Sequence, residues 1–387
     1  MNSGRTVFAQ LLGIVPFAHF EHLVDKYQSN RSTQSFTAWS HFICMSYAQF
    51  TRREGLRDLV LCLNSHRGRL YHAGLRQKAY RSTLADANER RNYQLFEALA
   101  QRLIDIALKA HKDTVIGVRL NEPLYALDST TIDLCLKLFP WADFRTSKAA
   151  VKAHTVIDLR GAIPVMVTIT TGKVHDVKAL DSLQLPAGSI VVMDRAYLDF
   201  SRLSALVARK INFVVRAKDN MRYEVIQANT VLSDTGILSD ELIKLVTYKS
   251  KMNYPSALRR VAFFDAKSER ELVFLSNRID LDATTIALIY KQRWQVELFF
   301  KWLKQNLVIK HFFGNSLNAV KLQIWIAICT YLIAVISHKS LREKISLRNF
   351  LHLIEANMFE KITLKQMVET ALDGIEINEL NRQAVLL

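Results

Sequence analysis

Five side chains between residues 290 and 304 are of types that bind phosphate groups or metal ions. Tyr290, Arg293, Glu297, Lys301 and Lys304 follow one another at steps of three or four residues. Such steps return to one side of an α-helix, which has 3.6 residues per turn. One carboxylate would then lie among four phosphate-binding groups, and the apolar residues of the segment would pack the helix down. This spacing indicates a helix that holds a metal ion against a nucleic-acid backbone.

Two aspartates follow apolar, strand-like segments far from this helix. Asp128 lies at the end of the strand predicted in LYALDST, and Asp194 follows IVVM. A carboxylate just past a buried strand lies at the sheet edge, where sites form; the alternative is an Asp that starts a turn or caps a helix. Together with Glu297, they supply the oxygen ligands that suit Mg²⁺ or Mn²⁺. A pair of such ions about 3.5–4 Å apart would serve phosphodiester chemistry.

Three other acidic residues are weaker candidates for metal ligands. We expect Asp133 on the next strand or turn and Asp158 in the turn before Arg160. Asp176 is expected to cap the helix that follows it. Ser129 is not expected to be a nucleophile, because no His–Asp pair lies near it in the sequence.

Arg195 and Tyr197 come directly after Asp194 in the motif VVMDRAYLDF. Two interpretations stay open for both side chains. Either they hold DNA or the Asp194 carboxylate, or they serve local structure.

The residues that must position these side chains have the texture of an α/β domain with a mixed sheet. We expect two strands within residues 124–139 and a long helix from Asp282, its N-cap, to Lys304. Residues 217–270 are more polar and contain short β-prone pieces, LVTYKS and LRRVAFFDA. The further expected elements are strands Ala153–Asp158, Ile163–Thr170, Ser189–Met193, Ile211–Val215 and Glu271–Ser276, and helix Phe200–Arg209.

The first 110 residues look helical and basic. Helix-like apolar spacing covers residues 36–47, 55–63 and 93–110, and Ser82 is a candidate start for a helix between them. The residues between these predicted helices are rich in arginine and lysine, which predicts a helical DNA-binding domain. The alternative is a solvated helical surface. The predicted DNA-binding residues of this region are Arg67, Arg69, Arg76, Arg90 and Arg91.

The composition agrees with a polyanionic partner. The net charge of the 387-residue chain is +16 and its pI is about 9.7, which favours nucleic acid, although many basic proteins bind none. The four cysteines form no CxxC pair, so we expect neither a zinc site nor a disulfide framework. This cysteine usage predicts a reducing compartment, the cytoplasm. The N-terminus does not resemble a secretory signal. The apolar stretch 322–337 is shorter than the ~20 residues that span a bilayer, so we expect a buried core helix.

These motifs resemble the insertion-sequence-4 family of bacterial DDE transposases, whose core has the ribonuclease H-like fold. The resemblance is carried by LDSTTIDL, VVMDRAYLDF and the signature Tyr-x2-Arg-x3-Glu-x6-Lys from Tyr290 to Lys304, and by the N-terminal run LNSHRGRLYHAGL…STLADANERR. It implies that Asp128, Asp194 and Glu297 are catalytic and bind metal, and that Tyr290, Arg293 and Lys304 contact DNA phosphates. Lys301 is added to the DNA-binding residues from helical spacing alone.

Residues 217–270 lie where the family carries a β-rich insertion. Some relatives stack a flipped base on a Trp of this insertion when they cut through a DNA hairpin, but the segment contains no Trp here. An aromatic residue of another type would have to stack the base. The hairpin step therefore stays open. The aromatic candidates are Tyr223, Tyr248, Tyr254, Phe263 and Phe264.

The resemblance predicts the organisation of the whole chain. The expected parts are a helical DNA-binding domain (1–115), a ribonuclease H-like core in two pieces (116–216 and 271–345), a β-rich insertion (217–270) and a C-terminal helical region (346–387). The predicted function is a DNA transposase that binds the terminal inverted repeats of an insertion sequence. It would cleave the ends of this insertion sequence and join them to target DNA. The alternatives are a metal-dependent nuclease without strand transfer and a non-catalytic DNA-binding regulator.

The resemblance also predicts partners and surroundings. We expect two ions of Mg²⁺ or Mn²⁺, a homodimer on DNA, no membrane, and a cytoplasmic, nucleoid-associated protein.

Overall fold

The computed structural model describes residues 4–372 except 32, 34, 119, 146–147, 232–234, 307–310 and 342–344. The chain divides into two compact units, which are described separately. The first unit contains Met1–Lys112, Lys137–Trp141 and Lys301–Leu387, and the second contains Asp113–Leu136 and Ala142–Phe300. The domain boundaries predicted from the sequence stay a prediction. The expected helical course to Leu387 lies outside the described residues beyond 372.

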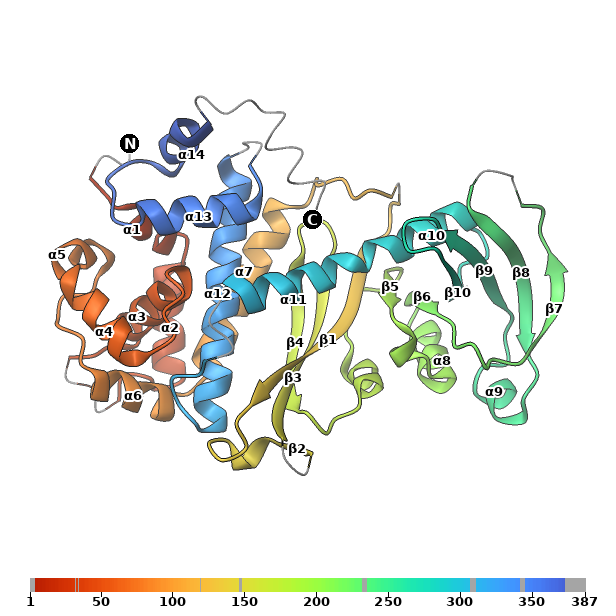
Figure 1. Ribbon diagram of the computed structural model, residues 1–387, viewed down its shortest axis with the longest axis horizontal. Coiled ribbons are helices and arrows are strands. Elements are labelled where there is room, and N and C mark those ends of the chain that lie inside the picture. Colours follow the sequence, from red (N-terminus) through yellow and green to blue (C-terminus); the bar gives the residue numbers. More distant parts are fainter. Residues whose placement is uncertain are drawn as a thin grey trace. The chain divides into compact units, whose positions relative to one another are not determined.

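The second unit is built on one sheet, which has ten strands among the described residues (Figure 1). The strands are β1 (Leu124–Leu134), β2 (Asp143–Arg145), β3 (Lys148–Asp158), β4 (Ile163–Thr171), β5 (Ile190–Met193), β6 (Asn212–Arg216), β7 (Tyr223–Ala228), β8 (Ile237–Leu245), β9 (Leu258–Asp265) and β10 (Arg270–Ser276). Their order is β2-β3-β1-β5-β6-β10-β9-β8-β7, and β4 pairs with β3 off this path.

The central strands have the ribonuclease H-like arrangement. β4, β3 and β1 are antiparallel neighbours, and β1, β5 and β6 are parallel neighbours. Helix α8 (Phe200–Ala208) connects β5 to β6, as a parallel pair requires. The predicted fold class, a mixed sheet flanked by helices, is confirmed.

The expectation of two strands within residues 124–139 is wrong. β1 is one strand of 11 residues, because β3 is equally long and pairs with it from Tyr125 to Leu134. Asp128 therefore lies inside β1 rather than at its end. It does lie at the end of the parallel pairing with β5, whose last pair is Leu127 with Met193.

The insertion extends the same sheet. β10 pairs with β6, and β9, β8 and β7 follow outward as antiparallel neighbours. Of the β-prone piece LVTYKS, only Leu245 lies in a strand, since helix α9 (Tyr248–Asn253) starts three residues later. The other expected strands and helix α8 are present within a few residues of their predicted bounds.

The expected helix from Asp282 to Lys304 is two helices, α10 (Ala283–Gln292) and α11 (Trp294–Asn306). Asp282 caps α10 as predicted, because its carboxylate accepts the Thr285 N–H at 2.7 Å. The break lies at Arg293, where the main chain turns more tightly: the Arg293 N–H donates to the Tyr290 carbonyl, three residues back. The continuous periodicity of the sequence gave no sign of this break.

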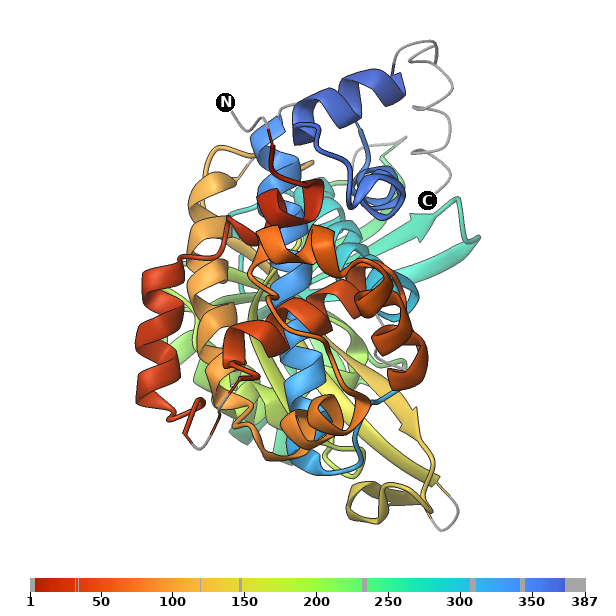
Figure 2. The same cartoon turned by 90° about the vertical axis from the view of Figure 1, so that its left-hand side faces the viewer.

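The first unit is helical (Figure 2). Its helices are α1 (Val7–Leu12), α2 (Phe17–Lys26), α3 (Ala38–Phe50), α4 (Leu56–Ser65), α5 (Arg67–Leu70), α6 (Arg81–Arg90), α7 (Gln94–Ala110), α12 (Leu317–Leu341), α13 (Leu347–Asn357) and α14 (Leu364–Leu372). Helices α3, α4 and α7 confirm the three predicted from apolar spacing. Thr37 caps α3 and Ser346 caps α13 through their hydroxyl oxygens. Short 3₁₀ helices occur in both units: η1 (Tyr71–Ala73) in the first, η3 (Asp176–Ser182) and η4 (Arg195–Tyr197) in the second, and η2 (Pro140–Ala142) with residues of both.

Helix α12 contains the apolar stretch 322–337. It is the one helix among the described residues that is long and apolar enough to cross a membrane, but 94% of its most apolar window is buried within the structure. It packs against α3 and α7, which confirms the predicted core helix.

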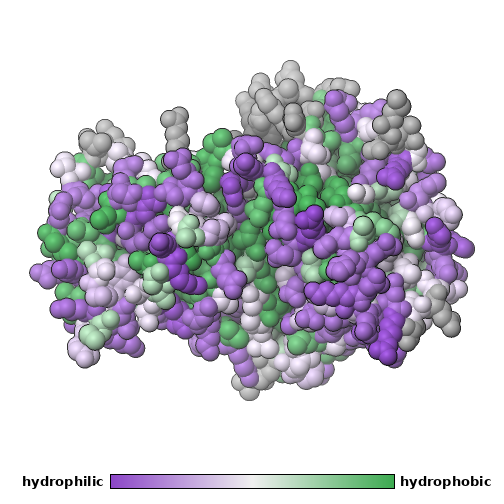
Figure 3. Space-filling view, turned by 180° about the vertical axis from the view of Figure 1, so that it is seen from behind, coloured by the Kyte–Doolittle hydropathy of each residue, from purple (hydrophilic) through white to green (hydrophobic). Residues whose placement is uncertain are grey.

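Hydrophilic side chains cover much of the molecular face in Figure 3, with hydrophobic patches between them.

Candidate active site

The register of two parallel strands brings Asp128 and Asp194 to neighbouring positions. Leu127 of β1 pairs with Met193 of β5, and each aspartate is the next residue along its strand. The carboxyl ends of adjacent parallel strands meet at one sheet edge, where ligands bind in open α/β folds. Asp194 thus follows the end of β5 as predicted, whereas Asp128 lies inside β1, at the point where the parallel pairing of the two strands ends.

Helices α10 and α11 bring the signature residues to these carboxylates. Arg293 donates through Nη1 to Asp128 Oδ2 at 3.1 Å and through Nη2 to Glu297 Oε1. The Tyr290 hydroxyl donates to Asp194 Oδ1 at 3.4 Å, and its ring stacks on Phe274 with centroids 4.4 Å apart. Tyr290 and Arg293, which were predicted to contact phosphates, thus bond to carboxylates here.

The site gathers negative charge away from water. The pKa of Asp128 is raised to about 6, mainly by burial; the Ser129 N–H and Arg293 act against this shift, while Glu297 and Asp194 add to it. A carboxyl group with this environment gains from any cation that enters. Arg293 is the cation that fills this role here, and its side chain is only 14% exposed.

The expected convergence of three carboxylates on shared ions is not seen. Among the described residues, no group of three His, Cys, Asp or Glu side chains is close enough to hold a metal ion. The physical reason is that carboxylates repel one another, and the guanidinium of Arg293 stands between Asp128 and Glu297. The donor set itself fits a hard divalent cation, because it consists of carboxylate oxygens around a site of negative charge. Such an ion would compete with Arg293.

The signature residue Lys304 and the added Lys301 belong to the first unit. Lys301 is exposed and Lys304 half-buried on α11. Their contact with DNA stays a prediction.

One of the five arginines that were predicted to bind DNA in this unit is not exposed. Arg67, Arg69, Arg76 and Arg90 are exposed, but Arg91 is buried. Its guanidinium donates to three main-chain carbonyls, those of Ser29, Phe36 and Thr37. Arg91 therefore satisfies buried carbonyls of its own unit and is withdrawn from the DNA-binding residues.

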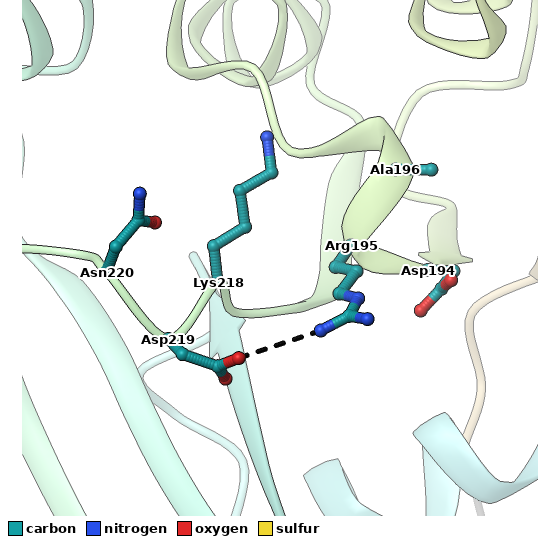
Figure 4. A pocket seen from close by; sticks show the side chains of 6 residues that line it. All are labelled: Asp194, Arg195, Ala196, Lys218, Asp219 and Asn220. Atoms are coloured by element: carbon teal, nitrogen blue, oxygen red, sulfur yellow. Dashed lines mark ion pairs between the residues drawn. The ribbon is translucent and has the colours of Figure 1, made fainter.

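A cavity of about 480 Å³ opens beside Asp194 (Figure 4). It lies between the segments that follow β5 and β6, and Figure 4 shows Arg195 turned toward Asp219, with which it forms an ion pair at 3.7 Å. A second cavity, of about 320 Å³, shares Lys218 and Asn220 with it and reaches Lys249 on α9. Sequence reasoning missed Lys218, although its place just past a parallel strand was a usable signal. The first cavity is lined by Asp194, Arg195, Ala196, Lys218, Asp219 and Asn220.

The prediction that Asp176 caps a helix is wrong. His175 holds the N-cap position of η3, and Asp176 is its first residue. The Asp176 carboxylate accepts hydrogen bonds from Ser129 Oγ at 2.7 Å and Lys152 Nζ at 3.1 Å. Ser129 thus has an aspartate beside it after all, but its hydroxyl bonds to that aspartate and not to a histidine, which is not the order of a catalytic triad.

The other weak candidates are also placed. Asp158 is fully buried at the end of β3 and pairs with Arg160. Asp133 is exposed on β1 itself, not on the next strand or turn. Neither was assigned to the site.

Comparison with known proteins places this geometry in a family. Residues 119–333, more than half of the chain, match the family described as Transposase DDE domain. The chain belongs to the DDE transposase family. Residues 3–76 match a domain of unknown function (DUF4372).

Three curated relatives are similar over most of the chain. A probable transposase for insertion sequence element IS5377 of Geobacillus stearothermophilus is 32% identical over 62% of this chain and 63% of its own length. The putative transposase y4zB of Sinorhizobium fredii is 30% identical over 72% of this chain and 77% of its own. A putative transposase for insertion sequence element IS4SA of Synechocystis is 28% identical over 73% and 79%. The chain thus spans slightly less than two thirds of the Geobacillus protein.

A solved structure, the cryo-EM structure of a piggyBac transposase synaptic complex with hairpin DNA, aligns with 97% of this chain and 82% of its own. Its sequence identity is 12% and its TM-score 0.44.

The family match confirms the prediction of a DDE transposase. Membership of this family implies a dependence on divalent metal ions in general, while the activity and the DNA partner of the whole protein belong to the proposal below. The finer assignment to the insertion-sequence-4 family stays a prediction.

Proposed function

We propose that this chain binds the terminal inverted repeats of an insertion sequence, cleaves the DNA at its ends and joins them to target DNA. Water attacks the phosphorus at each end and the 3′-oxygen leaves. The freed 3′-hydroxyl then attacks a phosphorus of the target strand and displaces a second 3′-oxygen. Both steps exchange one P–O bond for another, so no oxidant or nucleotide cofactor is needed.

The observation that supports this proposal is the linkage of Asp128, Asp194 and Glu297 through two signature residues. Arg293 bonds to Asp128 and Glu297, and Tyr290 bonds to Asp194, so three carboxylates distant in the sequence are tied into one site. A site with this much negative charge cannot receive a DNA phosphate without a cation to balance it.

Once Arg293 is displaced from Asp128 and Glu297, the three carboxylates are the residues that would hold two ions, Mg²⁺ or Mn²⁺. When bound, such ions supply an activated water or hydroxyl and stabilise the leaving oxygen. The protein's own groups do the positioning: the Tyr290 hydroxyl orients the Asp194 carboxylate, and the guanidinium of Arg293 holds Asp128 and Glu297. Once released from a carboxylate, Arg293 is free to bind a DNA phosphate bidentately.

Basic residues supply the path for DNA. Within the second unit, Arg195 and Lys218 border the cavity beside Asp194, and Lys249 continues this line onto α9. We assign the strand that contains the scissile phosphate to this cavity. We propose a second contact with DNA for cations of the first unit, most of which are exposed. The residues proposed for that contact are Arg67, Arg69, Arg76, Arg90, Lys301 and Lys304.

Two copies of the chain would pair the two ends of the element, as a homodimer on DNA at the bacterial nucleoid. The experiment uses a 40-bp duplex taken from each end of the DNA that flanks the coding region, with Mg²⁺. We expect Glu297→Gln and Asp194→Asn to bind the duplex as the wild type does and to cut it at least a thousandfold more slowly. Cleavage that survives in either variant would show that the residue is wrongly assigned.

A strand-transfer assay separates the alternatives. Pre-cut ends are incubated with the wild type, a plasmid target and Mg²⁺. Products joined to the plasmid support the transposase, and cleavage without joining would support a nuclease. A wild type that binds the ends and neither cuts nor joins them would support the non-catalytic regulator.

A further inference from the structure

A group of polar side chains lies on the sheet next to the candidate active site. We call it the Asp176 cluster. Asp176 Oδ1 accepts from the Ser129 hydroxyl at 2.7 Å and from the Lys152 ammonium at 3.1 Å, and lies 3.8 Å from His154 Nδ1. Lys152 also donates to the Val174 carbonyl at 3.1 Å. The members of the cluster are Ser129, Lys152, His154, Asp176 and Tyr197.

The cluster and Asp128 lie on opposite faces of the sheet. Side chains alternate between the faces of a strand, so Ser129 shares the face of Leu127, and Asp128 takes the other. Leu127 packs into the hydrophobic core that also contains Leu180 of η3 and Tyr197 of η4. The cluster therefore stands behind Asp128, at the edge of this core.

Both aspartates of the site are joined to this rear face by short stretches of chain. Ser129 follows Asp128 directly, and its N–H donates to Asp128 Oδ1 at 2.8 Å. Tyr197 comes three residues after Asp194, on η4, and is 1% exposed. The pKa of Tyr197 is raised well above its usual range, by burial and then by the charge of Asp128. The Tyr197 hydroxyl thus lies within electrostatic reach of the site from behind.

Two buried polar atoms of the cluster have no hydrogen-bond partner in the described part of the chain: His154 Nδ1 and the Tyr197 hydroxyl. His154 is 1% exposed and its Nε2 contacts Thr170 Oγ1 at 3.1 Å. Buried polar atoms are costly unless they are paired. The Asp176 carboxylate is the strong acceptor among them, so its charge holds together groups that would otherwise separate.

We propose that Asp176 is a positioning residue for the DNA cleavage proposed above: it anchors Ser129 and Lys152 and thereby fixes the direction of Asp128. The proposal rests on the proposed function in that Asp128 must hold a metal ion. Asp176 touches neither DNA nor metal in this role. Its effect passes through the Ser129 hydroxyl to the main chain at residues 128–129, which carries the Asp128 side chain and donates to it.

The test measures Mn²⁺ binding by electron paramagnetic resonance, on the full chain with a 40-bp end duplex. The variants are Asp176→Ala, Ser129→Ala, their double mutant and Asp176→Asn, which keeps an acceptor for Ser129. The matched control is Asp133→Ala, since Asp133 is an exposed aspartate on β1, the strand that contains Asp128 and Ser129. Thermal unfolding and duplex binding without metal are measured in parallel, because a purely structural role would change those two quantities instead.

We expect Asp176→Ala to weaken Mn²⁺ binding at least tenfold, and to raise by the same factor the Mn²⁺ concentration for half-maximal cleavage. Asp176→Asn should recover part of this loss, and the double mutant should be no worse than Asp176→Ala, because both changes break one connection. Asp176→Ala should bind the duplex without metal as the wild type does. The control Asp133→Ala should match the wild type in Mn²⁺ binding.

Mn²⁺ binding within twofold of the wild type in Asp176→Ala would overturn the proposal, as would a loss of thermal stability with unchanged Mn²⁺ binding. Asp194→Asn tells these results from failure of the proposed function. If Asp194→Asn abolishes Mn²⁺ binding and Asp176→Ala does not, only the role of Asp176 is refuted. If Asp194→Asn binds Mn²⁺ as the wild type does, the proposed metal site is refuted as well.

Discussion

Asp128 and Asp194 are 66 residues apart in the sequence, yet each directly follows one member of the same parallel pair, Leu127 with Met193. The hydrogen-bond register of β1 and β5 therefore sets the spacing of the two aspartates. A shift of this register by one residue would turn one of the two carboxylates to the opposite face of the sheet. The strands fix these two residues, and the third carboxylate comes from a helix that Arg293 ties to the sheet.

Replacing Arg293 by Gln should strengthen metal binding in the absence of DNA. The guanidinium occupies the space between Asp128 and Glu297, so an ion must displace it. One charged hydrogen bond contributes about 1.5–3 kcal/mol, which predicts about 10–100-fold tighter Mn²⁺ binding. Calorimetric titration with Mn²⁺ measures this change, and Lys291→Gln, an exposed cation on α10, is the control. Weaker Mn²⁺ binding in Arg293→Gln would show that Arg293 supports the metal site instead of competing for it.

Asp128→Asn should stabilise the metal-free protein at neutral pH. The pKa of Asp128 is about 6 in the folded state and 3.8 for an ordinary aspartate, so the folded state holds the proton more tightly. Its contribution to stability is full below about pH 4 and is lost as the pH rises through 6. We expect the variant to unfold at pH 7.5 with a free energy about 1–3 kcal/mol higher than the wild type. Urea unfolding in EDTA at pH 4.5 and 7.5 tests this; an equal or lower free energy at pH 7.5 would contradict it.

The first unit should lose stability in mild acid because of His41. This residue is fully buried, its pKa is lowered from 6.5 to about 3 mainly by burial, and its Nε2 bonds to Asn88 Oδ1 at 2.8 Å. Only the unfolded state takes up a proton between these two values, so stability is full above pH 6.5 and falls as the pH decreases. The slope is about 1.4 kcal/mol per pH unit for this group.

His41→Gln removes the titrating group and keeps a side chain that can donate to Asn88. The difference in unfolding free energy between pH 6.5 and 5.0 should therefore be about 2 kcal/mol smaller than in the wild type. Exposed His72→Gln should leave this difference unchanged. An unchanged pH dependence in His41→Gln would mean that His41 is accessible to protons in the folded state.

Two adjacent arginines should have opposite effects. Arg91→Ala leaves the carbonyls of Ser29, Phe36 and Thr37 without their donor, so the unfolding free energy should fall by about 2–4 kcal/mol. Arg90→Ala changes an exposed side chain, so stability should stay within about 0.5 kcal/mol while binding of the end duplex weakens. Denaturation and gel-shift titration of both variants measure these effects. If Arg90→Ala binds DNA as the wild type does, the proposed contact at α6 is wrong.

The sequence by itself determined which residue types can do the chemistry and which elements carry them. The apolar runs before Asp128 and Asp194 identified strands, Asp282 identified a helix start, and steps of three and four put Arg293 and Glu297 on one side of a helix. These are local properties, because strand alternation, capping and helical periodicity depend on neighbours a few residues away.

Tertiary structure alone decided how these pieces meet. Whether β1 stops or continues past Asp128 depends on the length of β3, which lies downstream in the chain. Packing between helices decides whether the Arg91 side chain reaches solvent or the carbonyls around Phe36. The basic sequence around Arg91 is compatible with either position. The partners of Asp176 come from strands far from it in sequence. Long-range pairing sets each of these outcomes, and no local pattern records it.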